Sequence, residues 1–136
     1  VPFHRGVWSL VRDLGLLYKS NPDIHGLDHE PGGFEWIDCH DTDQSVISYI
    51  RRHKNSEGVV VVVCNFTPVV RDHYRIGVPN HGIYVERINS DAQEYCGSGV
   101  GNEGNVHSDE IPAHGRPYSL NLKLPPLGGL VLVYQP

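Results

Sequence analysis

The sequence has little cysteine, a deficit of positive charge and no long apolar run. Its three cysteines are far apart, and none forms a C-x-x-C pair. This scattered, odd set gives no disulfide framework, and with no signal-peptide pattern at the start we expect a reducing, cytoplasmic compartment. The longest apolar run, Val59 to Cys64, has six residues. A membrane-spanning helix needs about 20, so no membrane partner is expected.

The charge balance argues against nucleic acid as a partner. There are 11 Lys and Arg residues against 16 Asp and Glu residues, a formal net charge of −5. Such a surface repels phosphate backbones. The basic run Arg51, Arg52, His53 and Lys54 is the one counter-signal, and we interpret it as a solvated hairpin end.

One amphipathic helix is predicted at the start of the chain. Apolar residues recur there at helical spacing: Phe3, Val7, Leu10, Val11, Leu14, Leu17 and Tyr18. Pro2 suits the first turn, and Asn21-Pro22 ends the helix because the residue before proline is pushed out of the α region. The apolar stripe of this helix needs a partner.

The rest of the chain reads as one mainly β domain, since 136 residues are too few for two comfortable domains. Seven short segments with turn residues between them are predicted as strands: 34–39, 45–53, 58–66, 72–78, 82–89, 118–124 and 129–135. They favour an antiparallel, Greek-key-like β-sandwich preceded by one α-helix. Val59 to Val63 is apolar on both faces and is expected at the centre of a sheet. The glycine- and proline-rich segment 90–117 is predicted as a long loop.

Three patterns that suggest catalysis or a cofactor do not hold up in context. Gly99 to Gly104 matches G-x-G-x-x-G, but no helix is predicted after it, so no dinucleotide site is expected. Nine histidines lack the spacing of a zinc site, and no metal or other cofactor is predicted. Asp38, Asp41 and Asp43 are typical of turns, and nothing sets them opposite a second carboxyl group, so we assign no catalytic residue.

Trp36 is the one residue for which two interpretations stay open. In the strand FEWID, Phe34 and Trp36 share one face, and Glu35 and Ile37 share the other. Trp36 is either a core residue or an exposed platform on which a sugar ring stacks, with Glu35 or Asp38 accepting sugar hydroxyls.

Four blocks carry a resemblance to a known family. The sequence reads HRGVWSLVRDLGLLYKSNPDIHGLDHEPGGFEWIDCHDTDQSVISYIRR, VVCNFTPVVRDHYRIGVP, INSDAQEYCGSGVGNEG and HSDEIPAHGRPYSLNLKLPPL. Together these blocks resemble, in order and over essentially the whole chain, the C-terminal part of bacterial 1,4-α-glucan (glycogen) branching enzymes. The NFTP motif is intact at Asn65 to Pro68, as is SGVGN at Ser98 to Asn102, whereas Cys96 stands where relatives often carry glycine or histidine.

The resemblance implies a fold and a role. Branching enzymes resemble α-amylases, in which a (β/α)₈ barrel carries the catalytic Asp and Glu and a C-terminal β-sandwich follows. On this basis residues 1–32 are the last barrel helix and a linker, and residues 33–136 are the sandwich. The parent enzyme cleaves α-1,4 links in glucan and transfers the segment to a 6-hydroxyl, which forms α-1,6 branches in glycogen. The catalytic positions would lie before Val1, so the chain alone is expected to be inactive.

Two roles for the chain stay open at this point. It is either an accessory module that contacts α-glucan through Trp36, Glu35 and Asp38, or a purely structural module that supports the barrel without touching sugar. A stand-alone metal or interaction domain is a weaker third reading. The expected partners are α-glucan through the parent enzyme and the barrel in cis. The leading helix is expected to fold back on the sandwich, self-associate or stay partly exposed.

Overall fold

A computed structural model describes residues 1–54 and 57–136. A long helix leads into a short helix, a 3₁₀ turn and eight strands within these residues. The bounds are α1 Pro2–Ser20, α2 Pro22–His25, η1 Pro31–Gly33, β1 Phe34–Asp41, β2 Val46–Arg51, β3 Val60–Asn65, β4 Arg71–Val78, β5 Ile83–Asn89, η2 Gln93–Tyr95, β6 Asn105–His107, β7 Tyr118–Leu124 and β8 Gly129–Gln135.

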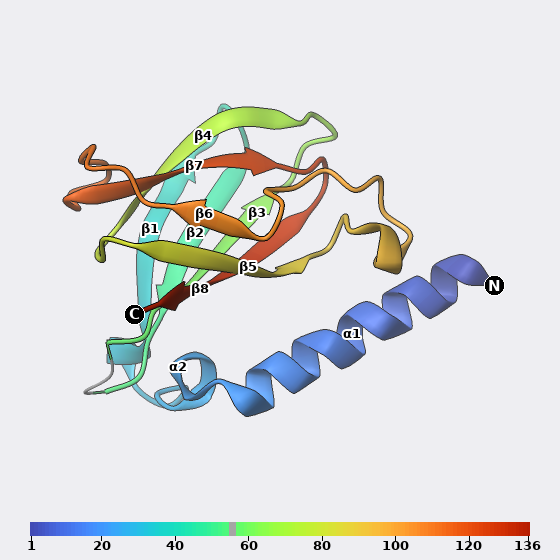
Figure 1. The fold of residues 1–136 in the computed structure, drawn as a ribbon, viewed down its shortest axis with the longest axis horizontal. Helices are drawn as coiled ribbons and strands as arrows, with labels where there is room; N and C mark the ends of the chain where they lie inside the picture. Colours follow the sequence, from blue (N-terminus) through green and yellow to red (C-terminus); the bar gives the residue numbers. More distant parts are fainter. Residues whose placement is uncertain (55–56) are drawn as a thin grey trace.

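The strands form two antiparallel sheets that pack face to face (Figure 1). The larger sheet has the strand order β1-β2-β3-β8-β5-β6, and the smaller one pairs β4 with β7. The predicted mainly β, antiparallel fold with a leading helix is therefore confirmed. Each of the seven predicted segments holds a strand, but residues 90–117 are more than a loop, because they contain η2 and β6. That part of the prediction is wrong.

The core lies between the two sheets and is built by alternation along the strands. Leu120, Leu122 and Leu124 of β7 are buried, while Asn121 and Lys123 between them are exposed. In β3, Val60 and Val61 are both fully buried, on opposite faces. This confirms β3 as a central strand covered on both sides, with β2 and β8 as its neighbours.

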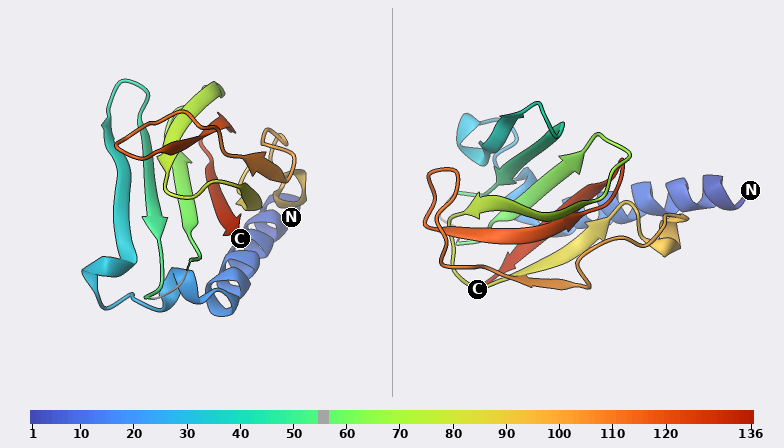
Figure 2. Two further views of the ribbon diagram at one scale, coloured as in Figure 1. Left: turned by 60° about the vertical axis from the view of Figure 1, so that its left-hand side comes forward. Right: turned by 90° about the horizontal axis from the view of Figure 1, so that it is seen from above.

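Helix α1 runs along the outside of the larger sheet and contacts the sandwich on one side only (Figure 2). Its Leu17 is buried, and Gly6 lies so close to Tyr95 that a Cβ there would come within 2.6 Å of the Tyr95 carbonyl oxygen. The Tyr95 hydroxyl donates to Asp13 at 2.6 Å, and the Cys96 thiol donates to the Pro2 carbonyl at 3.2 Å. These contacts join α1 to η2.

The other side of α1 is exposed. The sequence left open whether this helix folds back on the sandwich, self-associates or stays partly exposed. Its exposed apolar side chains are Phe3, Val7, Trp8, Val11, Leu14, Leu16 and Tyr18. The helix therefore folds back along one side and presents apolar residues on another. Its self-association stays a prediction. No helix in the described parts of the chain is long and apolar enough to cross a membrane.

The NFTP motif explains how the ends of the two sheets are joined. Asn65 is buried at the end of β3, and its amide donates to the carbonyls of Val69 at 2.9 Å and Pro125 at 3.0 Å. Its side-chain oxygen accepts from the Thr67 amide and hydroxyl at 3.1 and 2.8 Å. One side chain thus fixes both the β3–β4 and the β7–β8 connections.

We expect Asn65→Ala to lower the free energy of unfolding by about 2–4 kcal/mol, because it leaves buried backbone groups without hydrogen-bond partners. Urea unfolding followed by circular dichroism measures this. The exposed Asn105 gives a control, Asn105→Ala, that should change stability by less than about 0.5 kcal/mol. Equal effects of the two substitutions would contradict the role assigned to Asn65.

The contact between α1 and η2 should depend on pH. The hydrogen bond from Tyr95, and next to it Arg12, holds the pKa of Asp13 below its ordinary value of 3.8. A lowered carboxyl pKa stabilises the docked helix above the ordinary pKa, and this stabilisation is lost as the pH falls through the lower value. Hydrogen exchange, corrected for intrinsic rates, should show less protection of α1 amides below about pH 4.

Tyr95→Phe should reduce α1 protection at pH 7 and flatten its pH dependence, because only the donating hydroxyl is removed. Tyr118→Phe, on β7, is the matched control and should leave α1 protection unchanged. A wild-type pH dependence in the Tyr95→Phe chain would show that the Tyr95 hydroxyl does not hold the helix.

Candidate functional site

Trp36 faces away from the core because of the register of β1 against β2. Trp36 lies opposite Tyr49, and Phe34 lies opposite Arg51. Directly opposed residues share one face of a sheet. Ile37 is buried on the inner face, so Trp36 points outward and its side chain is 47% exposed. The structure thus decides between the two interpretations of Trp36 in favour of an exposed residue.

Phe34, Trp36 and Tyr49 form an aromatic cluster on this outer face. The Phe34 and Trp36 rings meet edge to face, with centroids 4.9 Å apart and an interplanar angle of 89°. Phe34 stacks on Tyr49 at 4.9 Å and 29°, and Trp36 meets Tyr49 edge-on at 6.0 Å. Such contacts favour a fixed ring orientation over free rotation. The cluster supports the indole of Trp36 from two sides.

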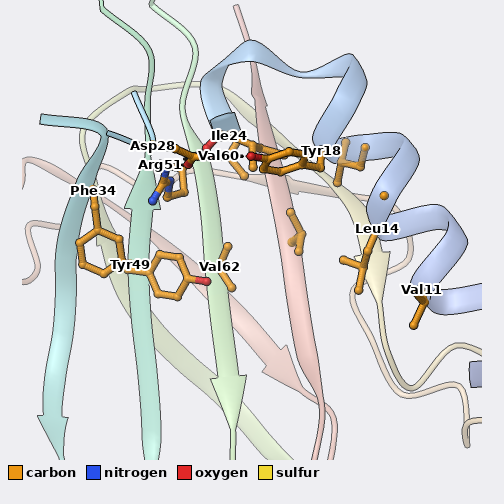
Figure 3. A pocket seen from close by; sticks show the side chains of 13 residues that line it. Val11, Leu14, Tyr18, Ile24, Asp28, Phe34, Tyr49, Arg51, Val60 and Val62 are labelled. Carbon is orange, nitrogen blue, oxygen red and sulfur yellow. Dashed lines mark hydrogen bonds and ion pairs between the residues drawn. The ribbon is translucent and has the colours of Figure 1, made fainter. Parts of the chain in front are cut away.

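An apolar groove continues from the aromatic cluster toward α1. Phe34 and Tyr49 form its wall on the sheet side, and Leu14 and Tyr18 face them from the helix across β3 and β8 (Figure 3). Its volume is about 650 Å³. In the groove the Tyr18 hydroxyl and the Arg51 guanidinium both bond the Asp28 carboxylate. Burial raises the pKa of the Tyr49 phenol, which keeps it neutral.

Glu35 does not lie on the face of the aromatic cluster. It is opposite Ile50, whose side chain is fully buried between the sheets, so Glu35 points to the inner side of β1. One carboxylate oxygen pairs with Arg52 at 3.1 Å, and the other pairs with Arg116. Arg52, predicted as part of a solvated hairpin end, therefore forms an ion pair with Glu35 of β1.

Asp38 also lies on the inner side of β1. The register shifts between Trp36 and Asp38, which places Asp38 opposite the buried Ser48. Its carboxylate accepts from the His40 amide at 2.9 Å and lies 3.5 Å from Nε2 of His114. Glu35 and Asp38 therefore lie on the same, inner side of β1, and neither lies on the outer face that carries Trp36.

Sequence reasoning missed two contributors to this site. Tyr49 completes the aromatic cluster, but its place depends on the β1–β2 register, which the sequence does not state. Arg116 lies 81 residues from Glu35 in the chain, and no local pattern links the two. Alternation alone did predict that Phe34 and Trp36 share a face. In the parts of the chain that the structure describes, no three His, Cys, Asp or Glu residues are grouped to hold a metal.

Comparisons with known proteins agree with this architecture. A family model described as the alpha amylase C-terminal all-beta domain matches residues 36–135. The chain is 49% identical over 134 residues to a 1,4-alpha-glucan branching enzyme GlgB of Aquifex aeolicus, an overlap of 98% of this chain and 21% of that protein. It is 52% identical over 133 residues to the GlgB of Rubrobacter xylanophilus, covering 98% of this chain and 18% of the relative.

A third relative, the GlgB of Trichormus variabilis, is 52% identical over 129 residues, which are 95% of this chain and 17% of that enzyme. The chain thus spans about a fifth of the length of these relatives. The region that the family model matches contains seven of the eight described strands whole and β1 from Trp36 on, and it includes the aromatic residues Trp36 and Tyr49. The chain belongs to the α-amylase C-terminal all-β domain family.

Proposed function

We propose that this chain is an accessory, α-glucan-binding module of a longer branching enzyme. That enzyme would cleave α-1,4 links in glucan and transfer the segment to a 6-hydroxyl, forming the α-1,6 branches of glycogen in the cytoplasm. Support for the enzyme comes from relatives named 1,4-alpha-glucan branching enzyme. The observation that carries the binding role is the outward-facing indole of Trp36, which meets Phe34 and Tyr49 edge to face.

The aromatic cluster has the chemistry that a glucose ring requires. One face of the ring presents C–H groups that pack on an aromatic surface, while its hydroxyls stay in water or bond polar groups at the rim. The exposed indole on an edge strand leaves room for neighbouring sugar units on both sides. That Glu35 or Asp38 accepts a sugar hydroxyl stays a prediction, and it requires the glucan to reach around the edge of β1.

The chain itself is catalytically inert on this proposal. Retaining transfer between sugars needs a nucleophile and an acid, two carboxyl groups about 5–5.5 Å apart across the substrate. We place both in a (β/α)₈ barrel that precedes this chain in the longer protein. Residues 1–32 are then the last barrel helix and a linker, and residues 33–136 are the sandwich.

The exposed side of α1 supports this division. Phe3, Val7, Val11 and Leu14 recur every three or four residues, so they lie along one side of the helix, next to the apolar groove. An apolar strip of this kind on a monomeric domain is normally covered. We propose that the barrel covers it and that α1, fixed to η2 by Tyr95 on its other side, joins barrel and sandwich.

A purely structural role is the alternative. It is favoured by the tight contact between α1 and η2, which steadies the helix without any sugar. It gives no reason, however, for a tryptophan exposed on the outer face of the edge strand. The exposure of Trp36 therefore favours the glucan-binding role.

Titration of the chain with maltoheptaose tests the glucan-binding role. Trp36→Ala should weaken binding by roughly tenfold, because it removes about 1–1.5 kcal/mol of stacking. Trp8→Ala is the matched control, since Trp8 is the other exposed tryptophan and lies on α1. Isothermal titration calorimetry or ligand-observed NMR gives the affinities. No binding by the wild type, or equal binding by wild type and Trp36→Ala, would refute the role.

Comparing the chain with the longer protein tests the covered side of α1. Val11→Asp should lower the stability of the longer protein by about 2 kcal/mol or more, because it buries an unpaired charge. In the 136-residue chain, where Val11 is exposed, the change should stay within about 0.5 kcal/mol. Arg5→Asp, on the polar side of α1, is the control and should be mild in both. Equal effects of Val11→Asp in the two proteins would contradict the assignment.

A further inference from the structure

The edge strand β1 has a free side, and one distant arginine bonds to it beside Trp36. Among the described strands β1 pairs with β2 alone, and its register shifts directly after Trp36. An edge strand with a bulge is the part of a sheet least fixed by its ladder. Arg116 donates to the Trp36 carbonyl at 3.2 Å and to the Glu35 carboxylate. Arg116 thus gives the Trp36 carbonyl a hydrogen-bond donor on the side of β1 where no described strand pairs.

The position of Arg116 is itself fixed by a tight turn. Ala113 and Arg116 exchange backbone hydrogen bonds of 3.1 and 2.9 Å around His114 and Gly115. Both central residues have positive φ, 50° and 73°, which is the two-residue turn of type I′. Its backbone twist matches that of the paired segments on either side. The turn therefore presents Arg116 from a rigid base.

The turn is also anchored on the second sheet. The Gly77 amide of β4 donates to Nδ1 of His114 at 3.0 Å, which leaves the ring proton on Nε2, facing Asp38. At Gly77 a Cβ would come within 1.9 Å of the Ala113 carbonyl oxygen, so the turn lies directly on the β4 backbone. The side chain of Arg116 is only 12% exposed. Arg116 is thus a bridge from β4 to β1.

We propose that Arg116 is a positioning residue for the indole of Trp36, and this inference rests on the proposed glucan-binding role. By bonding the Trp36 carbonyl and the carboxylate of the preceding residue, Glu35, Arg116 fixes the strand that presents the indole to the sugar. Glu35 then acts through Arg116, as its anchor, because it points to the inner side of β1. Both bonds leave Nη2, whose two N–H groups are fixed in the guanidinium plane. Lysine cannot replace the guanidinium fully, since its ammonium is a rotating point charge without fixed donor directions.

A chain carrying Trp8→Phe, in which Trp36 is the one remaining tryptophan, tests the inference. In this background Arg116→Ala should weaken maltoheptaose binding roughly three- to tenfold, the size of one ordinary hydrogen bond, because only the positioning of β1 is lost and no bond to the sugar. The anisotropy decay of the indole should show a larger nanosecond amplitude. The binding titration and the anisotropy decay are both measured at a temperature well below each variant's unfolding midpoint. Arg116→Lys should have a smaller effect in the same direction, and it stands in if Arg116→Ala does not fold.

Arg75→Ala is the matched control. Arg75 also pairs with a carboxylate, that of Asp109 at 2.9 Å, but it lies on β4 in the smaller sheet. It should leave both binding and indole motion unchanged. Wild-type binding by folded Arg116→Ala and Arg116→Lys chains, or an equal loss in Arg75→Ala, would overturn the positioning role. Unchanged binding in Trp36→Ala would instead refute the glucan site itself, which keeps the two failures distinct.

A double-mutant cycle separates the two roles of Glu35. If Glu35 acts through Arg116, Glu35→Gln and Arg116→Ala together weaken binding no more than the stronger single change. If Glu35 bonds the sugar directly, the two losses multiply, and that result would overturn the assignment of Glu35 as an anchor.

Discussion

Ile37 packs between the two sheets, and its burial decides where Trp36 points. Because neighbouring residues on a strand face opposite ways, a buried Ile37 leaves Trp36 on the outer face with Phe34. The register against β2 then brings Tyr49 to the same place. The aromatic cluster is thus a consequence of core packing. It is as rigid as the strand that carries it, which makes the free edge of β1 the weak point of the arrangement.

The chain presents two apolar surfaces of different chemistry. The aromatic cluster offers flat rings at a polar rim, which suits the C–H face of a sugar. The exposed side of α1 is mainly aliphatic, and its groove adds Val62 and Val131 to the Phe34 and Tyr49 rings that it shares with the aromatic cluster; this side suits protein side chains. One surface is accordingly proposed for glucan and the other for the barrel. Arg51 lies between them, bonding Asp28 at the end of the groove and facing the ring of Phe34 at 6.0 Å.

The sequence predicted the parts of this structure that depend on local patterns. Alternation located the β7 strand through its leucines, and proline placed the end of α1 at Asn21. The strand β6 was not predicted, because three residues are too few to show an alternating pattern in a glycine-rich segment. The outer face of Trp36 followed only from the structure, because an alternating pattern gives two faces without saying which one is buried. The bond of Arg116 to β1 joins residues about 80 positions apart and depends on the packing of the two sheets.

The proposed glucan-binding role depends on the indole of Trp36 being the group that touches glucan, and labelled tryptophan reports on this directly. A chain grown with 5-fluorotryptophan has two fluorine signals, one from Trp8 and one from Trp36, which the Trp8→Phe chain assigns. Added maltoheptaose should shift the Trp36 signal in a saturable way and leave the Trp8 signal in place. A saturable shift of Trp8 alone, or no shift of either signal at millimolar sugar, would contradict the account.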